Sequence, residues 1–386
     1  MDRLALEDTT RIAFIDLQAQ RRRLGSRIDE AISRVMAHGQ FIMGPEVAEC
    51  EKRLASFCGA RHVVTCGSGT QALFMALRAF GVTAGDAVFV PSFSFVAPAE
   101  ACALLGATPV FVDIQEGTFN IDPNCLEEAI DTANRHGLRP AGIISVDLFG
   151  QPADYPAVRD VATRFGLFIL ADAAQSFGAS LNGKRVGTLG DITATSFFPA
   201  KPLGVYGDGG ALFTDDDDMA SVLRSIRMHG AGEHRYDHVR TGLNGRMDTI
   251  QAAVLIEKLS IFDEEIRLRQ RVSERYCAEL GDLVSVPHLA DQVTSVWAQY
   301  TLVMRDHDRD TIAERLKEAG VPTAVYYRIP IHRQEAYRAF PVSTKGLPVT
   351  EAMAGQVLSL PMHPYLSEET QDVIVKAFRI AARGAK

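Results

Sequence analysis

The chain has 386 residues, 47% of them hydrophobic, and a formal net charge of −8 at pH 7. This length and composition predict a globular protein of two domains, and the acidic balance, with no basic run beyond residues 21–23, argues against a nucleic-acid partner. No segment approaches the roughly 20 apolar residues of a membrane-spanning helix, and the charged start MDRLALEDTTR lacks the apolar core of a signal peptide. We therefore expect a cytoplasmic protein with neither a nucleic-acid nor a membrane partner.

The elements predicted for the first part of the chain alternate between strands and helices. A helix outside the main sheet comes first, at RIDEAISRVMAHG, residues 27–39. Seven β-rich runs follow, several of them apolar almost throughout, which is typical of parallel strands buried on both faces. They begin at residues 62 (HVVTC), 87 (AVFVP), 109 (PVFVD), 142 (GIISVD), 167 (LFILAD), 193 (TATSF) and 210 (GALFT).

The segments between these runs are predicted to be crossover helices. Helical patterns begin at Thr70, Pro123 and Tyr155. Proline marks the start of the second pattern, and glycine marks the end of the second and third. The run of aspartates at residues 215–218 is interpreted as the first turn of a further helix. Together these patterns predict an α/β domain with a mostly parallel, seven-stranded sheet over residues 1–250.

The pattern changes near Met247, where a helical sequence continues to Gly281 without proline or glycine. A helix this long exceeds the usual globular length, so we expect it to connect two domains. After it come expected strands in AQYTLVM and TAVYY and expected helices in DTIAERLKEAG and SEETQDVIVKAFRIAAR. They predict a smaller α+β domain over residues 251–386, which the long helix begins.

The six cysteines form no CxxC pair and no cluster with histidine. They are Cys50, Cys58, Cys66, Cys102, Cys125 and Cys277. This spacing indicates neither a metal site nor a disulfide framework, so we interpret them as reduced core or surface residues.

Two segments combine a strand end with chemically useful residues. In CGSGTQAL, residues 66–73, small residues follow a strand and open a helix, where backbone N–H groups can bind an anion. Glycine and serine are also common in such turns for structural reasons alone. In LADAAQSFGA, Asp172 ends an apolar strand, where open α/β sheets bind ligands. Its carboxylate could pair with the cation of a flat ring, or it could simply cap a helix.

A lysine with unusual neighbours follows in SFFPAKPLGVYGDGGAL, residues 196–212. Lys201 stands between two prolines and near aromatic residues, which favours a desolvated amine that is nucleophilic toward a carbonyl. Most lysines lie at the surface, and the other seven of this chain are expected in polar or helix-surface settings. An anion-binding turn, a strand-end aspartate and a nucleophilic lysine are together what pyridoxal 5'-phosphate requires. We therefore predict this cofactor, with the glycines after Lys201 allowing close passage of the chain beside it.

The segments that carry these residues resemble the DegT/DnrJ/StrS family of sugar aminotransferases, which are fold type I pyridoxal-phosphate enzymes. The resemblance runs from FIDLQAQ to LSLPMHPYL, and its most specific pieces are GPEVAECE, CGSGTQAL, ADAAQSFGA, SFFPAKPLGVYGDGGA, GLNGRMDTIQAAVL and GVPTAVYY. Within the family the chain is most similar to the UDP-2-acetamido-2-deoxy-3-oxoglucuronate aminotransferases of bacterial cell-surface polysaccharide (O-antigen) synthesis. The resemblance implies a cytoplasmic homodimer that moves an amino group from glutamate to a nucleotide-linked ketosugar.

The resemblance also implies a role for each matching residue. Lys201 would form the Schiff base with the cofactor and move a proton, and Asp172 would keep the pyridine nitrogen protonated. Gln175 would contact the phenolic oxygen of the ring, and Phe95 would stack on the ring. The residues implied for the phosphate are Gly69, Thr70 and Ser196.

Two residues of GLNGRM, Asn244 and Arg246, resemble a family pair that reaches into the site of the partner subunit. The asparagine would meet the phosphate and the arginine would lie near the substrate, so that a monomer would be inactive. Each residue taken alone could instead be an ordinary cap, core or surface residue. For His229 and His332, a capping or packing role is more typical than catalysis.

The chain departs from many relatives where they carry His-Tyr-Pro and it carries Tyr326, Tyr327 and Arg328, in a segment that would face the sugar. Arg328 could contact a substrate carboxylate or diphosphate together with Arg246, or it could face solvent in place of proline. Amination of another 3- or 4-keto nucleotide sugar is an alternative function. A sugar dehydratase of this fold would carry histidine at the position of Lys201, and a regulatory homologue without turnover would be expected to lack Lys201 or Asp172.

Overall fold

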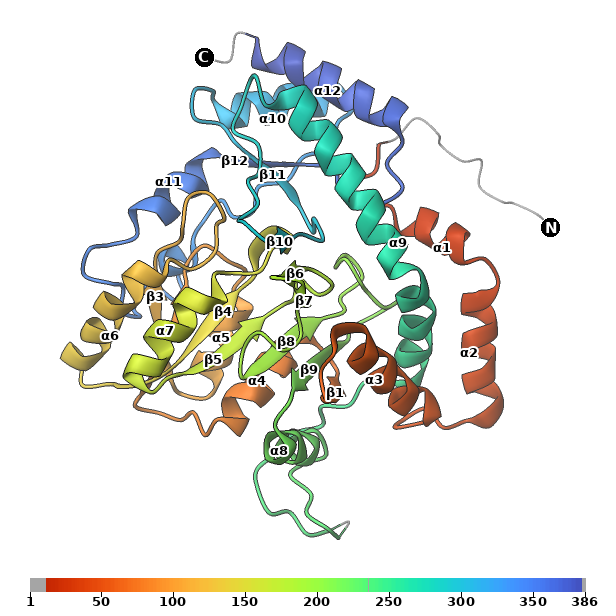
Figure 1. Cartoon of the computed structure of the whole chain (residues 1–386), viewed down its shortest axis with the longest axis vertical. Coiled ribbons are helices and arrows are strands. Elements are labelled where there is room, and N and C mark those ends of the chain that lie inside the picture. The colour runs from red at the N-terminus through yellow and green to blue at the C-terminus, as the bar shows by residue number, and fades with distance from the viewer. Residues whose placement is uncertain (1–11, 235, 384–386) are drawn as a thin grey trace.

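In the computed structural model, which describes residues 12–234 and 236–383, the first elements are helices α1 (Leu17–Leu24) and α2 (Arg27–His38). Helix α2 is the predicted first helix and lies outside the large sheet (Figure 1). The charged start, residues 1–11, lies outside the described residues, so its interpretation stays a prediction. None of the described helices is long and apolar enough to cross a membrane.

Seven strands form the large sheet, in the order β1-β9-β8-β5-β4-β2-β3. They are β1 (His62–Cys66), β2 (Asp86–Pro91), β3 (Thr108–Val112), β4 (Arg139–Val146), β5 (Phe168–Asp172), β8 (Ile192–Ser196) and β9 (Gly210–Thr214). Strand β9 runs antiparallel to its neighbours β1 and β8, and the other pairs are parallel. All seven predicted runs are strands of this sheet, which confirms the expected α/β fold.

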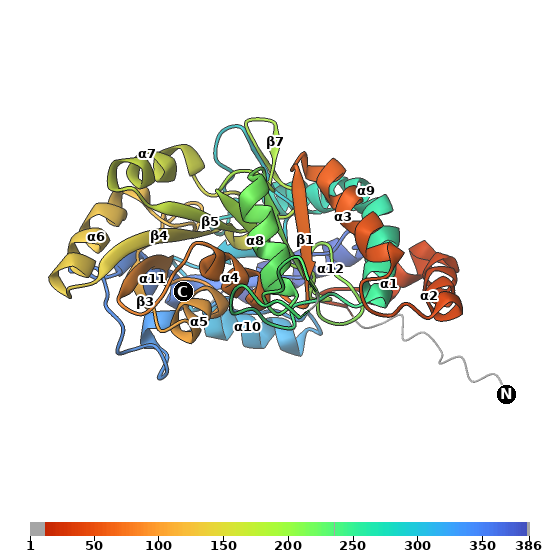
Figure 2. The ribbon, with the colours of Figure 1, turned by 90° about the horizontal axis from the view of Figure 1, so that it is seen from below.

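The strands are apolar on both faces because helices cover both faces. These helices include α4 (Gly69–Ala79), α5 (Ala97–Leu104), α6 (Leu126–Arg135) and α7 (Tyr155–Phe165). Figure 2 shows α6 and α7 on one side of the sheet and α4 and α5 on the other. In β2, Phe89 packs in the same cluster as residues of α6 and α7, whereas its neighbour Val88 packs with residues of α4 and α5. Burial of alternate side chains on opposite faces accounts for the continuous apolar runs.

Two further helices flank this region, α3 (Pro45–Cys58) and α8 (Asp217–Arg227). Helix α8 begins within the run of aspartates, as predicted. Asp216 caps it by accepting a hydrogen bond from the N–H of Met219 at 2.8 Å, and the next two aspartates fill its first turn. Their negative charges lie at the positive end of the helix dipole, which favours this start.

The predicted long helix is α9 (Thr249–Leu280), of 32 residues. Its first half packs with α3, through Leu255 among others, and its second half packs through Tyr276 with the C-terminal elements. Figure 1 shows it running from α2 and α3 up to α10 and α12. The C-terminal elements are β10 (Val293–Thr294), β11 (Tyr300–Val303), α10 (Arg309–Glu318), α11 (Pro348–Gln356), β12 (Val357–Leu360) and α12 (Glu368–Ala382). The helix thus joins two packed regions, as its length predicts.

The two regions also share packing that the sequence did not indicate. Met353 of α11 belongs to the same hydrophobic cluster as α4. Strand β10 pairs with β6 (Ser180–Leu181), which in turn pairs with β7 (Lys184–Arg185). The division of the chain at residue 250 therefore stays a prediction, with contacts crossing it in several places.

The expected strand in TAVYY is wrong. Among its residues only Ala324 makes a bridge, to Ser359 of β12, and the segment continues as irregular chain. The side chains of Tyr326 and Tyr327 pack against the hydrophobic cluster of the large sheet instead of alternating across a strand. Tertiary contacts therefore override the β-propensity of this aromatic segment.

Candidate active site

The candidate residues lie at one edge of the large sheet. Strands β1, β5 and β8 run parallel to one another and end at this edge with Cys66, Asp172 and Ser196. Strand β9 is antiparallel and therefore begins there, and its Gly210 pairs with both Cys66 and Ser196. Open α/β sheets bind ligands at the carboxyl ends of their strands, so this edge is the expected place for a site.

The turn after β1 makes close contact with the end of β8. A Cβ atom added to Gly69 would lie 2.6 Å from Cβ of Ser196, and one added to Gly210 would lie 2.5 Å from the carbonyl oxygen of Ser68. Ser68 caps α4 by accepting a hydrogen bond from the N–H of Gln71 at 3.1 Å. The first N–H groups of α4, at Gly69 and Thr70, have no partner within the helix. Together with the Ser196 hydroxyl they form a cradle that fits a phosphate.

Asp172 is buried at the end of β5, with 6% of its surface exposed. One carboxylate oxygen accepts a hydrogen bond from the N–H of Ala174 at 3.0 Å. Burial raises the pKa of this carboxyl, while the Ala174 N–H and the positive charge of Lys201 oppose that rise. A buried carboxylate of this kind needs a cationic partner, and the ring nitrogen of the cofactor suits it.

Lys201 lies in the loop between β8 and β9, where its N–H donates to the carbonyl of Phe198 at 2.9 Å. Burial lowers the pKa of its amine, and the charge of Asp172 acts in the opposite direction. A larger fraction of the amine is therefore uncharged than in an exposed lysine. The residues that are present thus fit pyridoxal phosphate: an anion cradle, a buried carboxylate and a desolvated amine at one sheet edge.

Gln175 and Tyr327 are brought together beside Asp172. The side-chain oxygen of Gln175 accepts a hydrogen bond from the N–H of Phe149 at 2.8 Å, and its amide nitrogen donates to the Tyr327 hydroxyl at 3.3 Å. The ring of Tyr326 packs edge-on against that of Tyr327, with centroids 5.7 Å apart. Burial raises the pKa of Tyr327. Tyr326 and Tyr327, in the segment where the chain differs from many relatives, therefore lie close to the candidate site.

Arg328 is not brought to this group of residues. Its guanidinium is exposed and makes two hydrogen bonds to the carboxylate of Asp310, at 3.0 and 2.8 Å. The expected contact with a substrate anion would therefore require exchange of partners. The geometry agrees better with the alternative in which Arg328 faces solvent.

The remaining predicted residues differ in exposure. The ring of Phe95, just after β2, is 55% exposed, and Asn244 is exposed as well. Arg246 is partly buried, and its Nε has no hydrogen-bond partner among the described residues. His229 and His332 both have structural contacts: the N–H of the first donates to the Leu243 carbonyl at 3.0 Å, and the ring of the second bonds the Ser92 hydroxyl at 2.8 Å.

One expectation about the lysines is wrong. Lys258, on α9, is fully buried, and burial lowers its pKa to about 8. Its Nζ lies 4.1 Å from the ring centroid of Tyr206. A helical pattern does not reveal that a lysine faces inward, so desolvation alone does not single out Lys201. What distinguishes Lys201 is its position beside Asp172 at the sheet edge.

Asp147 was missed by the sequence reasoning. It directly follows β4, at the same edge as Asp172, and is fully buried. Burial raises the pKa of its carboxyl to about 7, although three hydrogen bonds oppose the rise. The rule that singled out Asp172, a carboxylate at the end of an apolar strand, applies equally to GIISVD and could have found it.

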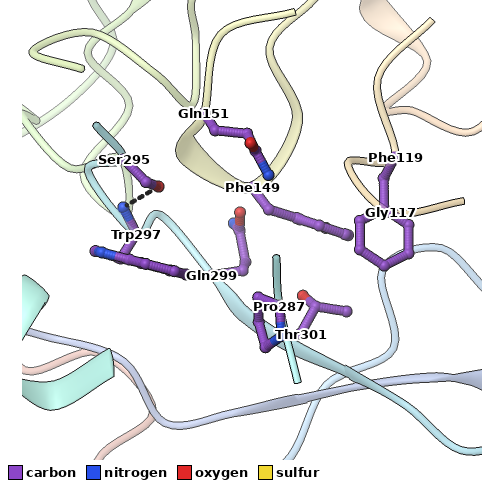
Figure 3. Close-up of a pocket in the computed structure, with 9 residues that line it drawn as sticks. All are labelled: Gly117, Phe119, Phe149, Gln151, Pro287, Ser295, Trp297, Gln299 and Thr301. Carbon is purple, nitrogen blue, oxygen red and sulfur yellow. Dashed lines mark hydrogen bonds between the residues drawn. The ribbon is translucent and has the colours of Figure 1, made fainter. Parts of the chain in front are cut away.

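A small cavity lies beyond Phe149 and is separate from these residues. Figure 3 shows Gln151 and Gln299 near Phe149, with Trp297 and Ser295 at one side. Its volume of about 10 Å³ suits one water molecule and excludes a nucleotide sugar. Within the described part of the chain, no group of three His, Cys, Asp or Glu side chains could hold a metal ion, and all six cysteines are free.

Comparison with known proteins adds independent information. The model of the DegT/DnrJ/EryC1/StrS aminotransferase family matches residues 22–379. The UDP-2-acetamido-2-deoxy-3-oxo-D-glucuronate aminotransferase of Pseudomonas aeruginosa is 48% identical over 367 residues, which cover 95% of this chain and 99% of that protein. A solved aminotransferase of the family from Brucella abortus has a TM-score of 0.93 and 50% identity, covering 95% of this chain and 98% of that one. NtdA of Bacillus subtilis, solved with bound cofactor PMP, has a TM-score of 0.85 and 30% identity, covering 96% and 83%.

Proposed function

The chain belongs to the DegT/DnrJ/EryC1/StrS aminotransferase family, and we propose that it aminates the 3-keto group of UDP-2-acetamido-2-deoxy-3-oxo-glucuronate with glutamate as donor. Its family makes it a pyridoxal-phosphate-dependent transaminase of nucleotide-linked sugars. The narrower substrate is supported by the 48% identity to the Pseudomonas aeruginosa enzyme. The observation that carries the chemistry is that buried Asp172, at the end of β5, and Lys201, in the loop after β8, lie at the same sheet edge as the Gly69–Ser196 contact.

Each residue of the site would have a distinct task in the transfer. Pyridoxal phosphate, when bound, supplies the electron sink that makes a proton on the substrate carbon removable. The Lys201 amine, whose pKa is lowered by burial, would hold the cofactor and later take up and return that proton. The Asp172 carboxylate would keep a proton on the ring nitrogen. The amide nitrogen of Gln175 would donate to the phenolic oxygen, since its own oxygen already accepts from Phe149.

The phosphate and the ring face would be held from two further segments. The N–H groups of Gly69 and Thr70 and the hydroxyl of Ser196 would donate to the phosphate oxygens. Phe95 would stack on the ring, which is supported by its exposed apolar side chain at the same sheet edge. A phenylalanine ring offers no hydrogen bond, so stacking is its whole contribution.

The site would be completed by a second subunit in a homodimer. Exposed large apolar side chains support such an interface, among them Phe198 and residues 41–43. Asn244 and Arg246 would then act in the site of the partner, the first on the phosphate and the second near the sugar. The unpartnered Nε of Arg246 supports a ligand or partner group at that position.

A contact between Arg328 and the anionic part of the sugar nucleotide would require release of its guanidinium from Asp310. Replacing Arg328 with alanine should raise the KM for the uronate more than the KM for a neutral ketosugar. Small and equal effects on both substrates would assign Arg328 to its surface ion pair alone. The tyrosines beside it, Tyr326 and Tyr327, would face the sugar, which their position next to Gln175 supports.

The rival functions differ from this proposal in identifiable residues. A sugar dehydratase of this fold would carry histidine where this chain carries Lys201. A regulatory homologue without turnover would be expected to lack Lys201 or Asp172, and the chain has both. A cytoplasmic location and a part in cell-surface polysaccharide synthesis, such as that of O-antigen, remain predictions that follow from the proposed substrate.

The test offers the purified enzyme glutamate and a panel of nucleotide-linked ketosugars, with mass spectrometry of the products. We expect amination of the 3-keto uronate and parallel lines in initial-rate plots, because the two half-reactions alternate. Preference for a neutral ketosugar would refute the proposed substrate, and intersecting lines would refute the alternation. A folded Lys201→Ala variant is the control, and it should aminate none of the panel.

A further inference from the structure

We propose that Asp147 is a positioning residue for the cofactor site, and that it holds residues 172–176 in the place where Asp172 and Gln175 act. The inference rests on the site residues of the proposed function. It does not make Asp147 a catalytic residue, since its contacts run to the protein and not to the cradle or to Lys201. Its role would be to fix, through hydrogen bonds, two groups that do meet the cofactor.

The carboxylate of Asp147 joins three separate segments. One oxygen accepts from the N–H of Ala153 at 3.0 Å and from the hydroxyl of Tyr155 at 2.8 Å. The other accepts from the hydroxyl of Ser176 at 2.6 Å, and Ser176 directly follows Gln175. In addition, the N–H of Asp147 donates to the carbonyl of Asp172 at 3.0 Å. Asp147 therefore holds residues 172–176 at both ends.

The residues that follow Asp147 set the orientation of the Gln175 side chain. Phe149 has a φ of 60°, a backbone conformation that residues other than glycine rarely adopt. In this conformation its N–H donates to the side-chain oxygen of Gln175 at 2.8 Å. The amide nitrogen must then face the other way, where it reaches the Tyr327 hydroxyl at 3.3 Å. The loop at residues 147–149 thus presents Gln175 as a donor toward the candidate site.

The same loop is fixed from its far side by residues of the C-terminal region. The carbonyl of Gly150 accepts from the N–H of Val296 at 3.0 Å, and the carbonyl of Phe149 accepts from the N–H of Gln299 at 3.4 Å. A Cβ atom added to Gly150 would lie 2.7 Å from the nitrogen of Trp297, so the two segments are in direct contact. Of these residues, Phe149, Trp297 and Gln299 line the cavity in Figure 3. Because these contacts fix the loop on its far side, Asp147 is itself held in place while its hydrogen bonds position residues 172–176.

The contacts of Asp147 allow a conservative replacement to separate position from charge. All its side-chain donors are neutral: an N–H and two hydroxyls. Asparagine would keep an oxygen for Ala153 and Tyr155, and its amide could donate to the Ser176 hydroxyl, which rotates freely. Alanine would remove all three bonds and leave the buried donors unpaired. A positioning role therefore predicts rescue by asparagine and failure by alanine.

The matched control is Asp154, a carboxylate at the start of the same helix. It caps α7 by accepting from the N–H of Ala157 at 3.1 Å, and within the described part of the chain its carboxylate makes no hydrogen bond to residues 172–176. Loss of either carboxylate weakens the start of α7, so both alanine variants should lower the melting temperature. Only loss of Asp147 should disturb the cofactor.

The experiment compares the full chains of wild type, Asp147→Ala, Asp147→Asn and Asp154→Ala, each freed of cofactor and then titrated with pyridoxamine phosphate. Affinity for pyridoxamine phosphate is measured by equilibrium dialysis, and the orientation of the bound ring by circular dichroism of the cofactor band. We expect Asp147→Ala to bind pyridoxamine phosphate about tenfold more weakly and to show a reduced circular dichroism signal, because it loses three hydrogen bonds. The affinities of the other two variants should stay within about threefold of wild type.

The inference is overturned if Asp147→Ala, while folded, binds pyridoxamine phosphate as tightly as Asp154→Ala with an unchanged signal. A failure of Asp147→Asn equal to that of Asp147→Ala would also overturn it, because charge and not position would then matter. If Asp147→Ala does not fold, Ser176→Ala takes its place, and wild-type binding by that variant overturns the inference. Failure of the wild type itself to bind pyridoxamine phosphate would instead refute the proposed site.

Discussion

Replacing Gly69 with alanine tests the contact on which the phosphate cradle depends. The added Cβ would lie 2.6 Å from Cβ and 3.2 Å from Cα of Ser196, closer than carbon atoms approach, so the turn or the end of β8 must move. Overpacking of this kind costs about 1 to 3 kcal/mol. In an open helix the same change would stabilise the protein by about 1 kcal/mol, since alanine has the higher helix propensity.

Gly355 of α11 provides the matched control, because a Cβ atom added there meets nothing within 4 Å. Urea unfolding of the cofactor-free protein should show opposite signs, with Gly69→Ala less stable and Gly355→Ala equal to or more stable than wild type. Adding Ser196→Gly to Gly69→Ala should recover part of the lost stability, because it removes the Ser196 Cβ at 2.6 Å and leaves only the Cα at 3.2 Å. The reasoning is refuted if Gly69→Ala is as stable as Gly355→Ala and binds pyridoxal phosphate with wild-type affinity.

Three further predictions concern the dimer, Lys201 and Lys258. Mixing equal amounts of Lys201→Ala and Asn244→Ala subunits, each inactive alone, should restore about a quarter of wild-type activity. Half of the dimers are then mixed, and each mixed dimer has one intact site of its two. No recovery after subunit exchange would contradict shared sites. Asp172→Asn should shift the pH midpoint for capture of pyridoxal phosphate by the cofactor-free protein downward, because the carboxylate raises the pKa of Lys201; an upward shift would contradict the pairing. Lys258→Met should stabilise the protein at pH 7 by up to about 3 kcal/mol, because folding no longer desolvates a charged amine. This gain should shrink as the pH rises from 8 toward 10.5, since in that range the Lys258 amine is protonated mainly in the unfolded chain. A pH-independent difference in urea unfolding would contradict the lowered pKa.

Much of the fold follows from local sequence patterns. All seven strands of the large sheet were predicted because both faces are covered, which makes their sequences apolar throughout. The long helix α9 was predicted because its 32 residues contain no proline or glycine. The structure of the TAVYY segment was predicted wrongly, because Tyr326 and Tyr327 are held by side-chain packing against the large sheet. Such contacts depend on residues distant in sequence, which no local pattern contains.

The site was predictable where one residue carries the chemistry, and less so where several share it. Lys201 and Asp172 stand out by their neighbours and by the strand ends they follow. Phe149 gives no such signal, because its contribution is a backbone N–H and a positive φ, which the sequence of a phenylalanine does not indicate. Lys258 shows the reverse error, since its helical surroundings suggested exposure and it is fully buried.

The two glycines that shape the cradle follow from the topology of the sheet. Strands β1 and β8 are separated by β9, so their ends lie about 9.6 Å apart, two strand spacings. For the turn after β1 to touch the end of β8, it must cross the beginning of β9. Gly69 and Gly210 both lie at this crossing: a Cβ atom on Gly69 would lie 2.6 Å from Cβ of Ser196 at the end of β8, and one on Gly210 would lie 2.5 Å from the carbonyl oxygen of Ser68 in the turn. The antiparallel strand thus explains how the turn after β1 and the loop of Lys201 could serve one cofactor, and why a side chain at either glycine would disturb this contact.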